Sequence, residues 1–260
     1  CDWSSDVCSS DLSQLYADDV ARVSKTPEAR RDELLDIALN LCTTVGYEAM
    51  SIDQVTRAAS VAKGTFYYHF GSKQDMLIAL VQRFVDDLFT DLERTQDALT
   101  GTGAERFHQL LTHATQWKTE RGDDAMAFVP LLYKPENLEL RHRLFDEWGA
   151  RTRHLFLPLV TLGAQDGSFT VDDAEAMTDL TLTLWVDGGA RLYDRALAAP
   201  TEDAFVDILV RGVAALTTGV ERVMGASPGT FEVPLDPAIV RAIHAPLKAA
   251  LTAPSPRSTR

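Results

Sequence analysis

Apolar residues recur every three or four positions along most of the chain, and this spacing predicts amphipathic helices. Four consecutive helices are predicted between residues 26 and 92. The first begins at Thr26, which precedes a proline at the first helical position, and ends at Gly46. The second begins at Ser51, which forms a capping-box pattern with Gln54.

The third predicted helix is short, covering about residues 61–70, and the fourth starts at Ser72 and runs to about residue 92. We expect Gly71 to end the third helix in a left-handed backbone conformation, because glycine adopts it without a steric penalty. Three compact helices followed by a long one predict a small N-terminal unit.

Helical spacing resumes beyond this unit, between breaks that contain glycine or proline turn sequences. The predicted segments are 104–119, 122–133, 136–163, 172–197, 201–224 and, after a linker, 238–251. No stretch of convincing length alternates as a strand does. The predicted fold class is therefore all-α.

Composition places the chain among globular proteins, since 45% of its 260 residues are hydrophobic and 24% are charged. No apolar run approaches the roughly 18 residues that span a bilayer, so we expect no membrane span. The formal net charge of -13 argues against a protein that coats nucleic acid by bulk charge, although a local basic patch can still bind it.

The first twelve residues, CDWSSDVCSSDL, resemble the translation of a sequencing-library adapter, which corresponds to Asp2 to Asp11. We interpret them as an artefact, with a genuine polar N-terminal tail as the alternative. Without them Cys42 is the one cysteine left, which excludes an internal disulfide and a cysteine metal cluster and suits a reducing cytoplasm. No pattern indicates a metal site, a cofactor site or a catalytic set, so an enzyme is not predicted.

The third predicted helix, within VAKGTFYYHFGSKQDM, has two unlike faces. Phe66 and Phe70 lie one turn apart and are assigned to the core. The remaining positions offer hydroxyl groups, a ring nitrogen, an ammonium group and bare backbone; they are Lys63, Gly64, Thr65, Tyr67, Tyr68 and His69.

Such a face suits a DNA groove. Glycine lets the backbone approach closely, the hydroxyl groups can donate to bases or phosphates, and Lys63 can neutralise phosphate or read guanine. The helix that begins at Ser51 would cross the DNA backbone, and the pair would form a helix-turn-helix. Lys73, in the first turn of the next helix, is predicted to clamp a phosphate.

The segment SIDQVTRAASVAKGTFYYHFGSKQDML, within residues 30–80, resembles the DNA-binding domain of TetR-family bacterial transcriptional regulators. Two positions depart from the family pattern: Val55-Thr56 replaces a frequent Ile-Ala, and Ala59-Ser60 replaces a frequent Ala-Gly in the turn between the helices. The resemblance implies DNA contacts at Ser51, Lys63, Gly64, Thr65, Tyr67, Tyr68, His69 and Lys73.

The resemblance also implies a domain organisation and a function. After residues 1–12, we expect a disordered arm at 13–25, the helix-turn-helix domain at 26–75, a helical ligand-binding and dimerisation domain at 76–225, and a linker, short helix and frayed tail at 226–260. The implied function is a homodimeric repressor that a small molecule releases from double-stranded operator DNA. Two alternatives stay open. The chain is an activator with the same fold, or it is an all-α enzyme or protein-interaction module whose aromatic helix is structural.

The implied dimer interface is formed by the helices at about 172–197 and 201–224. They carry apolar stripes and glycines that permit close approach, although burial within one chain is the alternative. These residues are Leu180, Leu184, Phe205, Ile208, Leu209, Val213 and Leu216, with Gly188, Gly189, Gly212 and Gly219.

Candidate effector contacts are the large amphipathic side chains of the middle helices, because aromatic walls with a few polar groups form small-molecule pockets. For each one, core packing or surface placement is the alternative. They are His113, Trp117, Met126, Phe128, Tyr133, Trp148, Arg151 and Trp185, with His154 beside them. The arginines Arg141, Arg143, Arg151 and Arg153 could meet an acidic ligand or form a solvated helix face.

Overall fold

The computed structural model describes residues 25–124, 132–134, 137–232 and 235–252. All regular secondary structure in these ranges is helical, which confirms the predicted fold class. Residues 1–12, most of the arm at 13–25, much of the predicted helix at 122–133 and the tail from 253 lie outside the described residues. No helix in the described ranges is long and apolar enough to cross a membrane.

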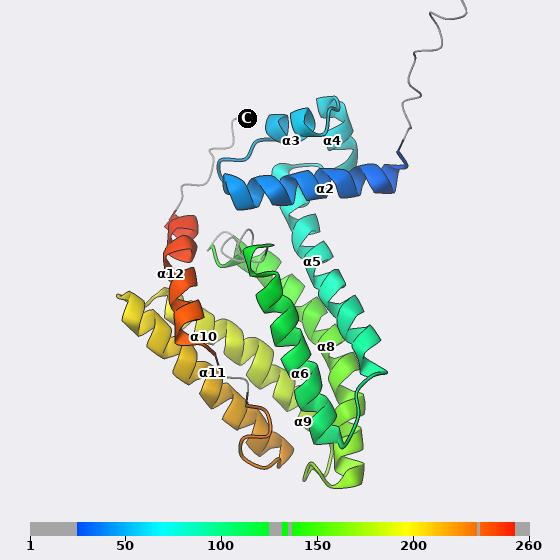
Figure 1. Ribbon diagram of the computed structural model, residues 1–260, viewed down its shortest axis with the longest axis vertical. Coiled ribbons are helices and arrows are strands. Elements are labelled where there is room, and N and C mark those ends of the chain that lie inside the picture. Colours follow the sequence, from blue (N-terminus) through cyan, green and yellow to red (C-terminus); the bar gives the residue numbers. More distant parts are fainter. Residues whose placement is uncertain (1–24, 125–131, 135–136, 233–234, 253–260) are drawn as a thin grey trace, which may run out of the picture.

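Three helices form the N-terminal unit: α2 (Pro27–Thr44), α3 (Ile52–Ala58) and α4 (Lys63–His69). In Figure 1, α3 and α4 lie together at the top and α2 crosses below them. The predicted caps are confirmed, since the Thr26 hydroxyl accepts from the Ala29 amide and Ser51 and Gln54 form a reciprocal capping box. The core of the unit contains Leu34, Leu35, Ala38, Val55, Phe66, Phe70 and Met76.

The turns on either side of α4 differ from the expected ones. Gly71 does not adopt a positive φ, so the predicted left-handed end of α4 is wrong; Phe70 leaves the helix in an extended conformation at φ -139°. Ser72 then caps the next helix by accepting from the Asp75 amide. Ser60, where the family often has glycine, has φ +54°.

Helix α5 (Lys73–Gln96) belongs to two cores. Its first turns place Met76, Ala79 and Leu80 in the N-terminal core, and its later turns place Phe89 and Leu92 in the larger bundle. In Figure 1 it runs from α2 down into the bundle beside α6 (Gly103–Glu120) and α8 (Leu138–Asp166). One continuous helix therefore joins the two units.

The larger bundle is closed by aromatic packing and by one close helix contact. The Phe107 ring lies 4.6 Å from Phe156 and 4.9 Å from Phe231, measured between centroids. A Cβ atom at Gly103 would collide with the backbone of Gly163, so α6 and α8 approach each other closely at this point.

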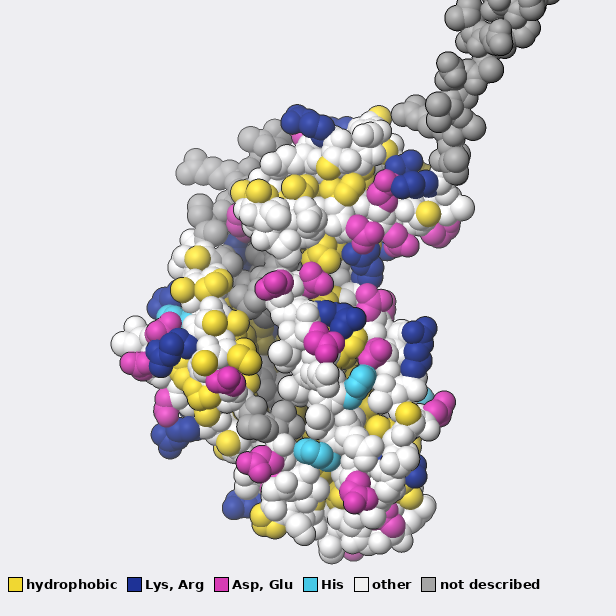
Figure 2. All heavy atoms as spheres, viewed as in Figure 1, with side chains coloured by type: hydrophobic (Ala, Val, Ile, Leu, Met, Phe, Trp, Pro, Cys, Tyr) yellow, Lys and Arg dark blue, Asp and Glu magenta, His cyan; other side chains and the backbone are white. Residues whose placement is uncertain are grey.

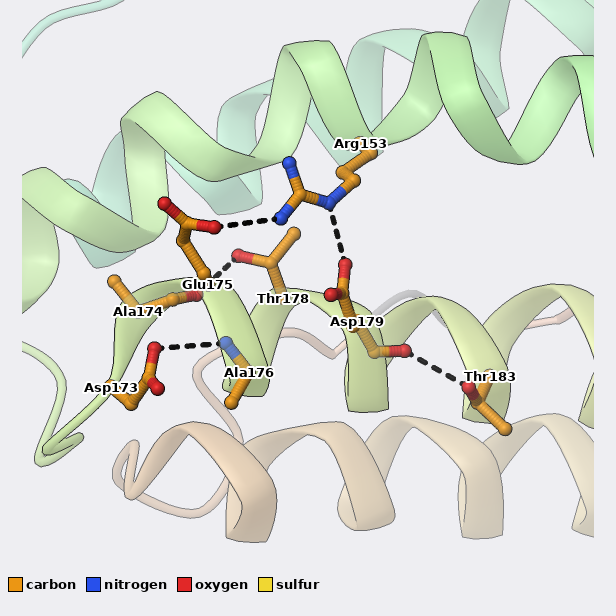
Figure 3. A network of polar contacts seen from close by, with 8 residues as sticks. All are labelled: Arg153, Asp173, Ala174, Glu175, Ala176, Thr178, Asp179 and Thr183. Atoms are coloured by element: carbon orange, nitrogen blue, oxygen red, sulfur yellow. Dashed lines mark hydrogen bonds and ion pairs between the residues drawn. The ribbon is translucent and has the colours of Figure 1, made fainter.

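Helix α9 (Ala174–Leu182) is fastened to α8 by charged side chains, as Figure 3 shows. Arg153 donates from Nε to Asp179 at 2.6 Å and pairs with Glu175 at 3.3 Å. Asp173 caps the helix by accepting from the Ala176 amide at 3.0 Å. These contacts fix the start of the segment that leads to the cavity described below.

The helix predicted over 172–197 is interrupted. After α9 the chain makes a π-helical turn over Thr183–Asp187 and continues as α10 (Gly188–Leu197). Such turns are rare and occur frequently at functional sites. The chain then forms α11 (Glu202–Met224) and α12 (Pro237–Thr252), and Val240 and Leu247 of α12 share a core with Phe205 of α11.

Candidate nucleic-acid interface and internal cavity

Helix α4 buries one face and exposes the other. Phe66 and Phe70 are 0% and 3% exposed, as their predicted core face requires, whereas Tyr67 and Tyr68 are 51% and 74% exposed. A Cβ atom at Gly64 would meet nothing within 4 Å, so the backbone there is open to a large partner. The exposed face thus presents two phenol groups beside accessible backbone.

The start of α4 is tied to α3 by an exposed ion pair. Lys63 Nζ lies 2.9 Å from Asp53 Oδ1. Their hydrogen bond and opposite charges lower the pKa of Asp53 and raise that of Lys63. A phosphate or guanine that binds Lys63 has to compete with this carboxylate.

A shallow hollow beside α4 is lined by residues of α2 and of the segment before it. Gly64, Thr65, Tyr68 and His69 line one side, and Lys25, Pro27 and Arg30 line the other. Burial, followed by the charges of Arg31 and Arg30, lowers the pKa of His69. Both Lys25 and Arg30 pair with Glu33, which lowers the pKa of that carboxyl group.

Two basic residues beside α4 were missed in the sequence. Lys25, before α2, and Arg30, in α2, are visible as charges, but only the fold brings them to the exposed face of α4. The hydroxyl group of Ser51, which was predicted to contact DNA, takes part in the capping box at the start of α3 and lies 3.0 Å from Gln54 Oε1.

Lys73 is engaged with the loop between α2 and α3. Its ammonium group lies 4.3 Å from the centroid of the Tyr47 ring and donates to the Glu48 carbonyl at 3.3 Å. Burial lowers its pKa. The same Glu48 contacts the buried Lys134 through its carboxylate, so this loop connects the N-terminal unit to the bundle.

A cavity of about 410 Å³ lies within the bundle. Helices α5, α6 and α8, the residues before α8, and the π turn with the start of α10 form its walls. The described lining residues are mostly aliphatic and aromatic: Phe84, Val85, Leu88, Phe89, Leu92, Leu110, Leu111, Ala114, Thr115, Lys118, Leu132, Tyr133, Phe145, Trp148, Thr152, Leu155, Phe156, Trp185, Val186 and Ala190. The volume is within the usual range of small-molecule pockets.

Three of the candidate effector contacts line this cavity: Tyr133, Trp148 and Trp185. Residues Met126 and Phe128 lie outside the described residues. The π turn contributes both Trp185 and its neighbour Val186, which a regular helix would place about 100° apart.

The other described candidates do not line the cavity themselves, although two of them contact residues that do. His113 Nε2 lies 2.5 Å from Asp91 Oδ2, and Trp117 is buried against Phe84 at 5.0 Å between ring centroids. Arg151 lies over the Phe89 ring and pairs with Asp86 at 2.5 Å. His154 is exposed.

The arginines of α8 are largely paired within the chain. Arg141 is buried and donates through both terminal nitrogens to Asp194, at 2.9 and 3.1 Å, while its guanidinium group covers the Tyr133 ring. Arg153 holds α9, and Arg143 is exposed. Much of this series therefore fastens helices together.

The sequence reasoning did not identify Lys118 or the apolar side chains of α5 as lining residues. A lysine near a helix end is normally solvated, and Phe84, Leu88 and Phe89 have the spacing of ordinary core residues. Within the described ranges, no three His, Cys, Asp or Glu side chains gather as a metal site would require.

The chain resembles known regulators in sequence and in structure. Residues 34–80 match the model for bacterial regulatory proteins of the tetR family. The HTH-type transcriptional repressor KstR2 of Rhodococcus jostii is 31% identical over 173 residues, which cover 60% of this chain and 77% of that protein. The fatty acid metabolism regulator protein of Bacillus subtilis is 25% identical over 190 residues, covering 70% and 94%.

Among solved structures, a TetR-family transcriptional regulator from Pectobacterium atrosepticum matches 76% of this chain and 95% of its own, with a TM-score of 0.56 and 21% identity. This match shows a shared fold.

Proposed function

The chain belongs to the TetR family of bacterial transcriptional regulators, which bind DNA, and from this premise we propose that it is a homodimeric repressor released from its operator by a small molecule. The observation that carries the proposal is α4, which buries Phe66 and Phe70 and turns Tyr67 and Tyr68 outward. We assign it no catalytic role and place its action in the cytoplasm, where the DNA is.

In the proposed complex, α4 enters the major groove while α3 crosses the DNA backbone. Tyr68, Thr65 and the open backbone at Gly64 face the base edges, and Tyr67 and His69 flank them. Lys63 exchanges its contact with Asp53 for the DNA. Lys25 and Arg30, on the far side of the hollow, supply phosphate contacts from α2 and the segment before it.

The role of Lys73 is indirect in this proposal. Because its ammonium group is held by the Tyr47 ring and the Glu48 carbonyl, it orders the loop that precedes α3. Ser51 likewise supports the start of α3 through its cap, and its exposed position lets the same residue approach a phosphate.

We propose that two copies associate through α9 to α11. Leu180 is 48% exposed, and Ile208, Val213 and Leu216 are only half-buried in one chain. Hydrophobic side chains gather over α11 and α12 on the face seen in Figure 2. Phe205 and Leu209, by contrast, are buried beside α12 and support the chain itself.

Two of the four glycines of these helices, Gly188 and Gly212, serve packing within one chain in this proposal, whereas a Cβ atom at Gly189 would meet nothing within 4 Å. A Cβ atom at Gly212 would collide with Leu192, and one at Gly188 would lie 2.9 Å from Leu216 Cδ2. Both glycines let α10 and α11 approach each other. The dimer proposal therefore rests on the half-buried apolar residues.

Release requires an effector that prefers the state that does not bind DNA, because equal affinity for both states shifts nothing. The cavity is the proposed effector site, with Tyr133, Trp148 and Trp185 in its wall. It adjoins the loop contact between Lys134 and Glu48, so a change in its shape can reach the N-terminal unit.

The test is DNA binding measured by fluorescence anisotropy, with fragments from upstream of the gene, a scrambled competitor and a series of salt concentrations. We expect sequence-selective binding whose affinity falls steeply with salt, since each neutralised phosphate releases counterions. Absence of selectivity on both the upstream fragments and a random DNA library, with refolded protein freed of ligand, would contradict the proposal.

A further inference from the structure

Lys118 is the one charged residue among the described residues that line the cavity. It lies in the last turn of α6, one helical turn from Ala114 and Thr115, which also line the cavity. Within the described part of the chain it makes no hydrogen bond and no ion pair.

The cationic groups of the neighbouring helix α8 differ in this respect. Arg141 pairs with Asp194, and Arg151 pairs with Asp86 and also lies 3.6 Å from Glu93. These three acidic side chains are paired with arginines, whereas Lys118 has no acidic partner among the described residues.

Lys118 is exposed, and it also lines the cavity. Its ammonium group therefore lies where the cavity meets solvent. An anionic group bound at this place would pair with a cation that has no partner among the described residues.

The rest of the lining suits a hydrocarbon. The hydroxyl groups of Thr115 and Thr152 donate to carbonyls of their own helices, Leu111 at 2.9 Å and Trp148 at 2.7 Å. The other described lining residues have aliphatic or aromatic side chains, and among these Tyr133 carries a hydroxyl group. A ligand that fills the cavity therefore meets apolar surface along its body and a cation at one point.

We propose that the effector is an amphiphile with an apolar body and an anionic head group whose oxygen atoms pair with Lys118 Nζ. The body occupies the space between α5, α6, α8 and the π turn. The inference rests on the proposed function, in which this cavity is the effector site, and it adds the chemical class of the ligand.

The test compares three probes with the same ten-carbon chain: decanoate, decyl phosphate and 1-decanol. Calorimetric titration of the full-length chain gives the affinity of each. We expect at least one oxyanion probe to bind about 10- to 100-fold more tightly than decanol, the range expected for a hydrogen bond to a charged group. The two oxyanion arms distinguish a carboxylate from a phosphate.

Three variants test whether Lys118 causes the preference for the oxyanion probes. Lys118→Met should reduce the affinity for the oxyanion probes to that for decanol and leave decanol within about twofold, since the apolar walls are unchanged. Lys118→Arg should keep part of the preference. Lys248→Met, which removes an exposed lysine of α12, is the matched control and should change nothing.

The inference is overturned if the wild-type chain binds neither oxyanion probe more tightly than decanol, or if Lys118→Met keeps the preference. DNA binding by the same preparations separates this inference from the proposed function. If the chain binds DNA selectively but shows no preference for the oxyanion probes, only the proposed class of ligand is contradicted. If it does not bind DNA selectively, the proposed function as a regulator is contradicted.

Discussion

Lys134, two residues after Leu132 in the wall of the cavity, contacts the carboxylate of Glu48 in the loop between α2 and α3. Lys134 is 4% exposed, and Glu48 also holds Lys73 through its carbonyl group. The contact therefore joins the wall of the cavity to the start of the helix-turn-helix within a single salt bridge.

Lys134→Gln should destabilise the chain, because it leaves the partly buried Glu48 carboxylate without its cation. We expect a loss of about 2 kcal/mol, less than for a fully buried pair. Urea unfolding measures it. Arg211→Gln, which breaks an exposed pair with Asp207, should cost under about 0.5 kcal/mol; equal losses in the two variants would contradict the structural role.

Ser60→Gly should stabilise the chain. Ser60 holds φ +54°, a region in which a side chain costs about 1–2 kcal/mol and glycine does not. The greater freedom of glycine in the unfolded chain offsets part of the gain, leaving about 0.5–1 kcal/mol. Ser60→Ala keeps the Cβ atom and serves as the control, so a Gly variant no more stable than the Ala variant would refute the strain.

Asp53→Asn should strengthen DNA binding. It frees Lys63 from its ion pair and removes a negative charge that faces phosphate. We expect a gain of about 3- to 10-fold at low salt that shrinks as salt screens the charges. Fluorescence anisotropy measures it, with Asp207→Asn on α11 as the control; unchanged affinity would mean that Lys63 lies off the DNA.

Tyr68→Phe should weaken selective DNA binding by about 3- to 10-fold, the effect of losing one neutral hydrogen bond. The salt slope should stay the same, because the hydroxyl group carries no charge. Circular dichroism should show unchanged helicity, since Tyr68 is 74% exposed. Tyr193→Phe on α10 is the matched control, and equal DNA affinities for both variants would remove Tyr68 from the recognition surface.

The Cys42 thiol should be inert at neutral pH. Burial raises its pKa to about 11, so only about one molecule in a thousand carries the thiolate at pH 8. In a chain with Cys1→Ser and Cys8→Ser, a disulfide reagent should react slowly with the folded protein and rapidly in urea. Similar rates in both conditions would show that the thiol is accessible.

The raised pKa of Cys42 also makes the stability of the folded chain depend on pH. The unfolded thiol, with a pKa near 9.0, loses its proton before the folded one does. The folded state therefore holds more protons between pH 9 and pH 11, and the contribution of Cys42 is complete below this range and declines through it.

The sequence predicted what local chemistry determines. Thr26, Ser51 and Ser72 cap helices because their hydroxyl groups accept from amides three residues away. The two faces of α4 follow from helical spacing alone, and the burial of Phe66 and Phe70 confirms them.

Features that depend on tertiary packing were not predicted from the sequence. The π turn at Thr183–Asp187 depends on how α9 and α10 pack against the rest of the bundle, and nothing in the periodicity of the segment marks it. The unpaired state of Lys118 depends on which carboxylates the arginines of α8 use. Gly71 was misjudged because α4 ends at Phe70 in an extended conformation, with Phe70 packed in the N-terminal core, so no left-handed residue follows the helix.

In the proposed release from DNA, helix α5 would act as a lever between the two cores that share it. Its 24 residues make a rod about 36 Å long at 1.5 Å per residue. A tilt of about five degrees about the end at Gln96 would move the other end by about 3 Å, close to the 3.4 Å rise of one base step. A ligand that widens the cavity only slightly can therefore shift each recognition helix by about one base pair along the groove.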